Sequence, residues 1–279
     1  MKPESARFAA EQLRANDRDR YFATLVLPDK ERAAITALYA FNADIASVRD
    51  RAKEAAAGEI RLQWWHDALA GEGHGAIRAN PLADAMLDTV AEYGLPVPAL
   101  IRMIEARRFD LYDDPMPDMT TFEGYAGETV SALYQLGAMI LNSGRPVEPG
   151  DAAGHLGVAH ALTGHLRAFG YNASRGRVVL PRDVFAVCGV KEADIRAGKE
   201  SENLSVALTR FADVASEHLR KADVAIAVLS RELRAVFAPR ALLGAQLKRL
   251  RLDAPFAPPP DLPDWQKIAV LGWWKLRGG

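Results

Sequence analysis

The sequence is poor in cysteine, almost neutral, and without a long apolar run. Cys188 is the single cysteine among 279 residues, which excludes an internal disulfide framework and favours a reducing compartment. Lys and Arg total 35 against 36 Asp and Glu, so the basic excess of a nucleic-acid-binding protein is missing. No apolar stretch approaches the ~18–20 residues that span a membrane. The first residues lack the apolar segment of a signal peptide, and we expect a cytoplasmic protein.

Strand patterns are also scarce, and helical periodicity dominates the chain. Prolines fall at helix-length intervals, and neither an internal repeat nor a domain boundary is recognisable. The sequence therefore predicts one all-α domain over residues 1–279, in which a proline-rich tether at 252–263 precedes a C-terminal amphipathic helix at 264–279. The predicted helices span residues 4–16, 29–51, 57–70, 80–93, 97–112, 120–142, 150–172, 203–230, 231–236, 240–251 and 264–276.

The segment around residues 38–50 has the frame of a metal-binding helix. Apolar residues recur there at steps of three and four, which predicts a helix packed on one side. Positions 46, 47 and 50 lie on a neighbouring face. The run Leu-Tyr-Ala-Phe at 38–41 and its continuation resemble the first aspartate-rich motif of the squalene/phytoene synthase family. The family has aspartates where this chain has Ala46, Ser47 and Asp50, so only Asp50 matches.

A second segment, at 161–181, resembles the second motif of the same family. That motif has an Arg-Asp pair, another acid four residues later, and then Gly-Arg and Leu-Pro. Arg167 and Arg177 match, as do the neighbouring glycine and the Leu-Pro pair at 180–181. The two acids are replaced by Ala168 and Asn172. In both motifs, the neighbouring residues of the family pattern are thus retained, whereas most of the carboxylates are replaced.

Those carboxylates matter because ionising a prenyl diphosphate requires Mg²⁺, which prefers hard oxygen ligands. With so few acids left, we expect no cofactor, and Mg²⁺ only if an altered ligand set operates. Asp50 and Asp110 are weak metal candidates, and Asp110 forms an acidic cluster with Asp113 and Asp114 that could equally be a solvated helix end. Asp44 is expected to point away from Asp50.

Three histidines, His155, His160 and His165, follow one another at steps of five. Five residues rotate a helix by about 140°, so these side chains are expected to point in different directions and not to form a zinc site.

The resemblance implies an isoprenoid-synthase-like helical bundle around a central cavity. It also implies a set of ligand- or diphosphate-binding positions. These are Arg32, Tyr39, Asp50, Asp110, Arg167 and Arg177. For the arginines the alternative is that each pairs with a carboxylate or caps a helix.

Two further segments, Ala-Phe-Asn-Ala-Asp-Ile at 40–45 and Glu-Thr-Val-Ser-Ala-Leu at 128–133, resemble a divergent branch of this family. That branch includes the mitochondrial assembly factor of respiratory complex I. The resemblance implies a non-catalytic protein that acts in assembly of a membrane-associated complex, with an isoprenoid or lipid as candidate ligand. Two alternatives stay open: an active prenyl-diphosphate transferase of the head-to-head type with altered metal ligands, and a lipid carrier.

The C-terminal segment 264–277 mixes tryptophan with basic residues, a combination typical of the water–lipid boundary. The sequence predicts that it contacts a membrane surface, as a peripheral protein of the inner membrane, or a membrane-associated partner. The alternative is that this helix packs back on the domain. The residues concerned are Trp265, Ile268, Val270, Leu271, Trp273 and Trp274, interleaved with Lys267, Lys275 and Arg277.

Overall fold

Helix is the only regular structure in the part of the chain that the computed structural model describes, residues 1–112, 114–147 and 149–278. The prediction of a single all-α domain is confirmed. The helices before residue 113 are α1 (Pro3–Asn16), α2 (Arg18–Thr24), α3 (Asp29–Ala46), α4 (Val48–Arg51), α5 (Ala55–Ala70), η1 (Ile77–Ala79), α6 (Pro81–Tyr93), α7 (Val97–Arg108) and η2 (Phe109–Leu111). Those that follow are α8 (Met119–Ala126), η3 (Gly127–Ser131), α9 (Ala132–Leu141), α10 (Gly150–Arg167), α11 (Phe169–Ser174), α12 (Arg182–Val187), α13 (Glu192–Arg196), α14 (Glu202–Ala227), α15 (Arg231–Arg234), η4 (Ala235–Phe237), α16 (Arg240–Leu247) and α17 (Asp264–Leu276).

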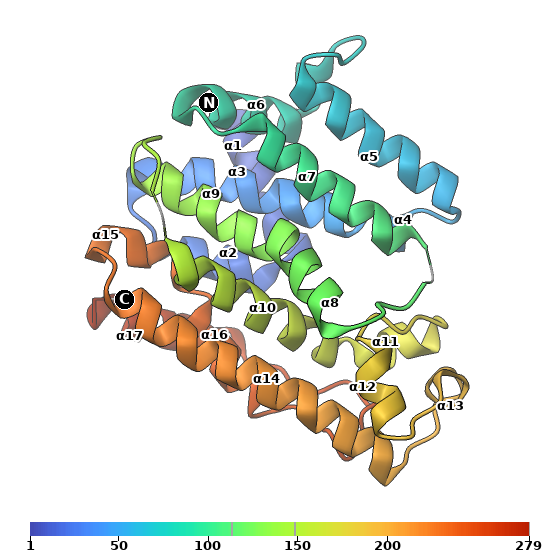
Figure 1. Cartoon of the computed structure of the whole chain (residues 1–279). Helices are drawn as coiled ribbons and strands as arrows, with labels where there is room; N and C mark the ends of the chain where they lie inside the picture. Colours follow the sequence, from blue (N-terminus) through green and yellow to red (C-terminus); the bar gives the residue numbers. More distant parts are fainter. Residues whose placement is uncertain (113, 148, 279) are drawn as a thin grey trace.

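Helices α3, α9 and α10 form the middle of the bundle (Figure 1). Helices α5 and α7 border one side, and α14 with α17 borders the opposite side. The apolar stripe of α3 is fully buried, including Ile35, Leu38 and Phe41. Burial of these side chains is the main source of stability in a helical domain of this size.

Close packing between α10 and η3 requires a glycine at position 157. A Cβ atom there would lie 2.0 Å from the Oγ atom of Ser131 and 2.6 Å from its backbone nitrogen. The five residues of η3 form a π-helical turn, a local widening that is frequent near functional sites. The absence of a side chain at Gly157 therefore lets α10 approach this turn.

Both predicted motif helices are interrupted at the motif itself. The helix expected at 29–51 breaks at Ser47, whose hydroxyl bonds to the carbonyl of Asp44 at 3.0 Å, a local bond that competes with the helical one. The helix expected at 150–172 breaks at Ala168, with φ −90° and ψ 7°. Sequence periodicity also missed α2, α12 and α13, because segments of seven, six and five residues are too short for a periodic signal.

Candidate functional site

A cavity of about 400 Å³ opens between α2, the α3–α4 break, α7 with η2, and the α10–α11 break. Its wall carries paired charges and also apolar side chains from both motif segments. The charged lining residues are Asp17, Arg20, Arg49, Asp50, Arg107, Asp110, Asp114 and Arg177. The motif positions Ala46, Ser47, Ala168 and Asn172 line the same cavity, so the fold brings both motifs to one site.

Asp50, the one acid retained in the first motif, is bound by arginines that follow the second motif. Its Oδ1 atom accepts hydrogen bonds from Arg177 at 2.9 Å and Arg175 at 3.4 Å. The guanidinium of Arg175 stacks on the ring of Tyr171, 4.4 Å from its centre, which orients it. Asp44 lies away from this cavity and lines a different pocket. The negative charge of Asp50 is therefore matched within the protein.

Asp110, which also lines the cavity, is held in the same way. It accepts hydrogen bonds from the Tyr125 hydroxyl at 2.8 Å and from Arg107 at 3.1 Å. Burial raises the pKa of Tyr125, so its hydroxyl stays protonated and donates. Asp114 also lies on the wall, whereas Asp113 of the predicted acidic cluster lies outside the described residues.

A third charge pair was not predicted from the sequence. Asp17 caps α2 by accepting from the backbone N–H of Arg20 at 3.0 Å, and its other oxygen binds the guanidinium of Arg20 at 2.5 Å. Both side chains line the cavity. The available signal was Asp17 itself, a favoured N-cap residue directly before the charged run at 18–20.

Two of the three histidines on α10 lie at the site. His160 and His165 both line the cavity, because α10 passes along its wall. Burial lowers the pKa of His165 to about 4, with Arg107 acting in the same direction. Burial also holds the pKa of His160 well below its ordinary value, and its Nδ1 atom lies 2.8 Å from the hydroxyl of Tyr134. Both imidazoles are neutral at pH 7.

The donor set of the wall does not fit a Mg²⁺ cluster. Among the residues that the structure describes, no group of three or more His, Cys, Asp or Glu side chains is arranged to hold a metal ion. Asp50 and Asp110, the two metal candidates, are each already bound by arginine. A divalent ion would have to displace these cations and still find further carboxylates.

Three of the six predicted binding positions, Arg32, Tyr39 and Arg167, lie outside the cavity lining. Arg32 donates to the backbone carbonyls of Thr24 and Leu27 at 3.1 and 2.9 Å, so it stabilises the turn between α2 and α3. Tyr39 is buried in the core, where its hydroxyl donates to the carbonyl of Val236 at 3.3 Å.

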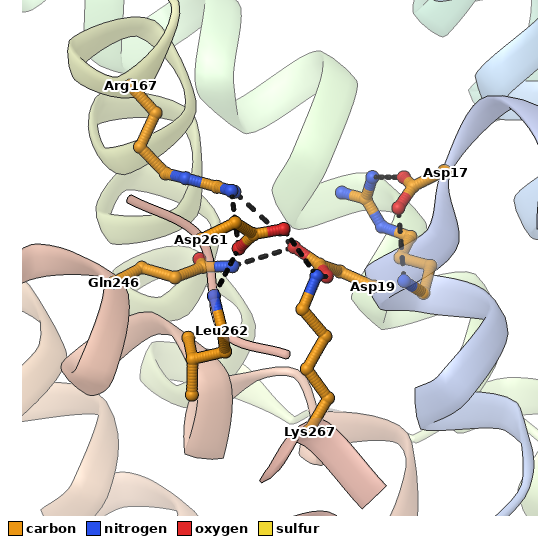
Figure 2. Close-up of polar contacts among 8 residues, drawn as sticks. Asp17, Asp19, Arg167, Gln246, Asp261, Leu262 and Lys267 are labelled. Carbon is orange, nitrogen blue, oxygen red and sulfur yellow. Dashed lines mark hydrogen bonds and ion pairs between the residues drawn. The ribbon is translucent and has the colours of Figure 1, made fainter. Parts of the chain in front are cut away.

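Arg167 belongs to a separate polar network (Figure 2). It donates to Asp261 at 2.9 Å and lies 3.4 Å from Asp19. The Nζ atom of Lys267 lies 2.6 Å from a carboxylate oxygen of each of these aspartates, and Gln246 donates to Asp19 at 2.7 Å. The network joins α2, α10, α16, α17 and the 252–263 segment.

The 252–263 segment, predicted as a tether, is packed onto α11. The ring of Phe256 lies 5.6 Å from that of Phe169, and Leu262 is buried. A Cβ atom at Gly170 would lie 2.3 Å from the carbonyl oxygen of Phe256, so this contact requires glycine.

The C-terminal helix α17 packs on α2 and α16 through one face, on which Lys267 and Leu271 are buried. Its other face is exposed. None of the described helices combines the length and the apolarity that crossing a bilayer requires.

Comparison with characterised proteins gives two kinds of relative. The chain is 30% identical to complex I assembly factor 6 of Rattus norvegicus over 220 residues (79% of this chain, 66% of the relative), and 29% identical to that of Homo sapiens over 215 residues (77% and 64%). It is also 28% identical to 15-cis-phytoene synthase of Synechococcus elongatus over 229 residues (77% and 73%). The chain thus spans just under two thirds of the length of these two assembly factors.

The fold resembles that of solved synthases. A dehydrosqualene synthase matches with a TM-score of 0.84 at 18% identity, over 98% of this chain and 96% of the other. A squalene synthase from Alicyclobacillus acidocaldarius matches with a TM-score of 0.71 at 17% identity, over 99% and 94%. The sequence model of squalene/phytoene synthases matches residues 13–266. With nearly the whole chain matched and the bundle and cavity in place, this protein belongs to the squalene/phytoene synthase family.

Proposed function

We propose that this chain is a non-catalytic member of its family that acts in the assembly of a membrane-associated complex. The observation that carries the proposal is the salt bridge between Asp50 and Arg177, which joins the two degraded motifs across the cavity. A cation is already present where a metal-bound diphosphate would need free carboxylates. Asp110 is held by Arg107 in the same manner.

The proposal that the complex is respiratory complex I is supported by the names of the assembly factors to which the chain is similar. In this role the protein is cytoplasmic and works at the inner membrane as a peripheral protein. The region expected to contact the membrane or the partner is 264–277.

The cavity is proposed to hold an isoprenoid or another lipid. Its volume of about 400 Å³ lies within the usual ~300–1,000 Å³ of small-molecule sites. Ala46, Ala168, Val130 and Val178 give apolar surface beside the arginines of the wall. An amphiphile with an anionic head matches this combination, because arginine binds phosphate oxygens through paired hydrogen bonds without a metal.

Purified protein incubated with Mg²⁺ and farnesyl or geranylgeranyl diphosphate tests the loss of catalysis. We expect no pyrophosphate release above the rate without protein. Sustained release together with a condensed product would show that the protein is an enzyme.

A genetic test addresses assembly. Deleting the gene is expected to reduce the NADH:ubiquinone oxidoreductase activity of membranes, and both the wild-type gene and an Asp50→Asn variant are expected to restore it. Restoration by the wild type alone would link assembly to the retained carboxylate and contradict a role without metal chemistry.

A prenyl-diphosphate transferase with an altered ligand set remains the second candidate. The observation in its favour is that Asp50, Asp110, Asp114 and Asn172 all line one cavity. On this hypothesis Mg²⁺ increases the thermal stabilisation given by a diphosphate analogue, and Asp50→Ala abolishes turnover. If neither Mg²⁺ nor the analogue changes the melting temperature, the transferase hypothesis fails.

A further inference from the structure

Helix α17 carries large apolar side chains on two opposite faces although it lies at the surface. Its inner face, at positions 267, 270, 271 and 274, packs on the domain. Its outer face carries Trp265, Ile268, Trp273 and Leu276, whose exposed fractions are 68%, 50%, 56% and 77%. A surface helix normally turns one apolar face toward the core and a polar face toward the solvent. Each of these four side chains, here called the outer ridge, keeps at least half of its surface exposed.

The outer ridge reaches the size of the largest apolar patch on a typical monomer, about 300–600 Å², and patches of that size are often functional. With fully exposed aromatic side chains presenting about 150–250 Å², the ridge offers roughly 500 Å² of apolar surface. Scattered apolar residues on a surface need no explanation, but four on one short helix do. The ridge therefore indicates a surface that is buried when the protein works.

The charges beside the ridge are mainly positive. No acidic residue follows Asp264 in the sequence, and Lys275 and Arg277 flank the ridge, with the guanidinium of Arg277 4.5 Å from the centre of the Trp273 ring. Arg234 of α15 donates to a backbone carbonyl just beyond α17 at 3.2 Å. Glu232 is the one acid of α15. Basic residues at the level of exposed tryptophans match the head groups of an anionic bilayer.

We propose that the outer ridge of α17 is a binding surface for an anionic lipid bilayer, on which the helix lies parallel to the membrane plane. The inference deepens the proposed function, because it rests on a role at a membrane and names the surface that is recognised. Tryptophan, isoleucine and leucine enter the boundary between head groups and acyl chains, and Lys275 and Arg277 contact anionic head groups. A flat bilayer requires no complementary pocket, which suits a convex helical ridge.

The inner face of α17 fixes the helix to the body while the outer ridge binds. Lys267 lies between Asp19 and Asp261, with its side chain 3% exposed, and the network in Figure 2 continues to Arg167 of α10. A helix held in this way presents its ridge as a rigid element, so binding need not cost the ordering of a free segment. Membrane binding then orients the whole bundle.

The test is cosedimentation of the full chain with vesicles of phosphatidylcholine containing about 30% phosphatidylglycerol, compared with pure phosphatidylcholine. We expect binding to the anionic vesicles and at least tenfold weaker binding to the neutral ones. Ile268→Glu and Trp273→Ser each are expected to weaken binding at least tenfold. Ile60→Glu is the matched control, because Ile60 is 73% exposed on α5 at the other side of the bundle, and it should bind as the wild type does. Circular dichroism checks that each variant is folded.

Three results would overturn the proposal. The first is no binding of the wild type to anionic vesicles, or equal binding to neutral ones. The second is equal loss of binding in the Ile60→Glu and Ile268→Glu variants. The third is a wild-type dimer in sedimentation velocity that Ile268→Glu converts to a monomer, which would make a second copy the occupant of the ridge. Vesicle binding requires neither substrate nor Mg²⁺, so its failure leaves the result of the turnover assay untouched.

Discussion

Replacing Lys267 by methionine tests whether the buried network holds α17 on the domain. The side chain is 3% exposed, and its ammonium group lies 2.6 Å from a carboxylate oxygen of both Asp19 and Asp261. Methionine keeps the length of the side chain but removes the charge and all three donors. The two aspartates then keep Arg167, and Asp19 keeps Gln246.

The loss of stability expected for Lys267→Met depends on how deeply Lys267 and its two aspartate partners are buried. Removing one partner of a fully buried ion pair costs about 3–5 kcal/mol. Here the lysine is buried but the Asp19 and Asp261 side chains are 24% and 48% exposed, so water compensates part of the loss and we expect about 3 kcal/mol. At about 2.1 cal/mol/K per residue, the unfolding entropy of 279 residues is near 0.6 kcal/mol/K, and Tm falls by about 5 °C.

Thermal and urea unfolding followed by circular dichroism measure this change. Lys275→Met is the matched control on the same helix, and because Lys275 is exposed, its Tm should stay within about 1 °C of the wild type. Adding Asp19→Asn to Lys267→Met removes one uncompensated charge and should recover part of the loss. If Lys267→Met unfolds at the temperature of the Lys275→Met control, the network contributes nothing to the attachment of α17.

Three further predictions concern packing, pH and metal. Gly157→Ala is expected to destabilise the protein by at least 2 kcal/mol in urea unfolding, because the new Cβ would lie 2.0 Å from Ser131 Oγ. In Gly154→Ala, on the same helix, the new Cβ meets no atom within 4 Å, and this variant should be more stable than the wild type by up to about 1 kcal/mol. Equal effects of the two substitutions would contradict the packing argument. Burial lowers the pKa of His165 from 6.5 in the unfolded chain to about 4 in the folded protein. The contribution of His165 to the free energy of unfolding is therefore complete above pH 6.5 and falls by up to about 3 kcal/mol as the pH drops toward 4. A His165→Asn variant whose stability has the same pH dependence as the wild type would refute this. Asp50→Asn breaks a half-exposed salt bridge and should lower the free energy of unfolding by at most about 1 kcal/mol. Millimolar Mg²⁺ should change the Tm of neither the wild type nor the variant. A Mg²⁺-dependent rise of Tm in the wild type alone would show that Asp50 binds metal.

The helical class and the family could be predicted from sequence because they depend on local patterns. The stripe from Ile35 to Val48 repeats at the helical period, and it is buried along its length. The motif segments kept enough neighbours, such as the Leu-Pro pair at 180–181, to be recognised without their acids. The substitutions at Ala46, Ser47, Ala168 and Asn172 are read directly from the chain, so the loss of carboxylates also needed no structure.

Only the tertiary structure decided which partner each charged side chain of the site and of α17 binds. The sequence could place Asp50 and Arg177 in two motifs, but the hydrogen bond between them at 2.9 Å spans 127 residues. The partner of Lys267 was equally hidden in the sequence. The sequence predicts Lys267 on an amphipathic helix that contacts a membrane, but in the fold this side chain is buried against Asp19, 248 positions away. Helical periodicity fixes which residues share a face. The partner of a charged side chain depends instead on the packing of distant helices, because a buried charge must meet its counter-charge wherever the fold brings one within reach.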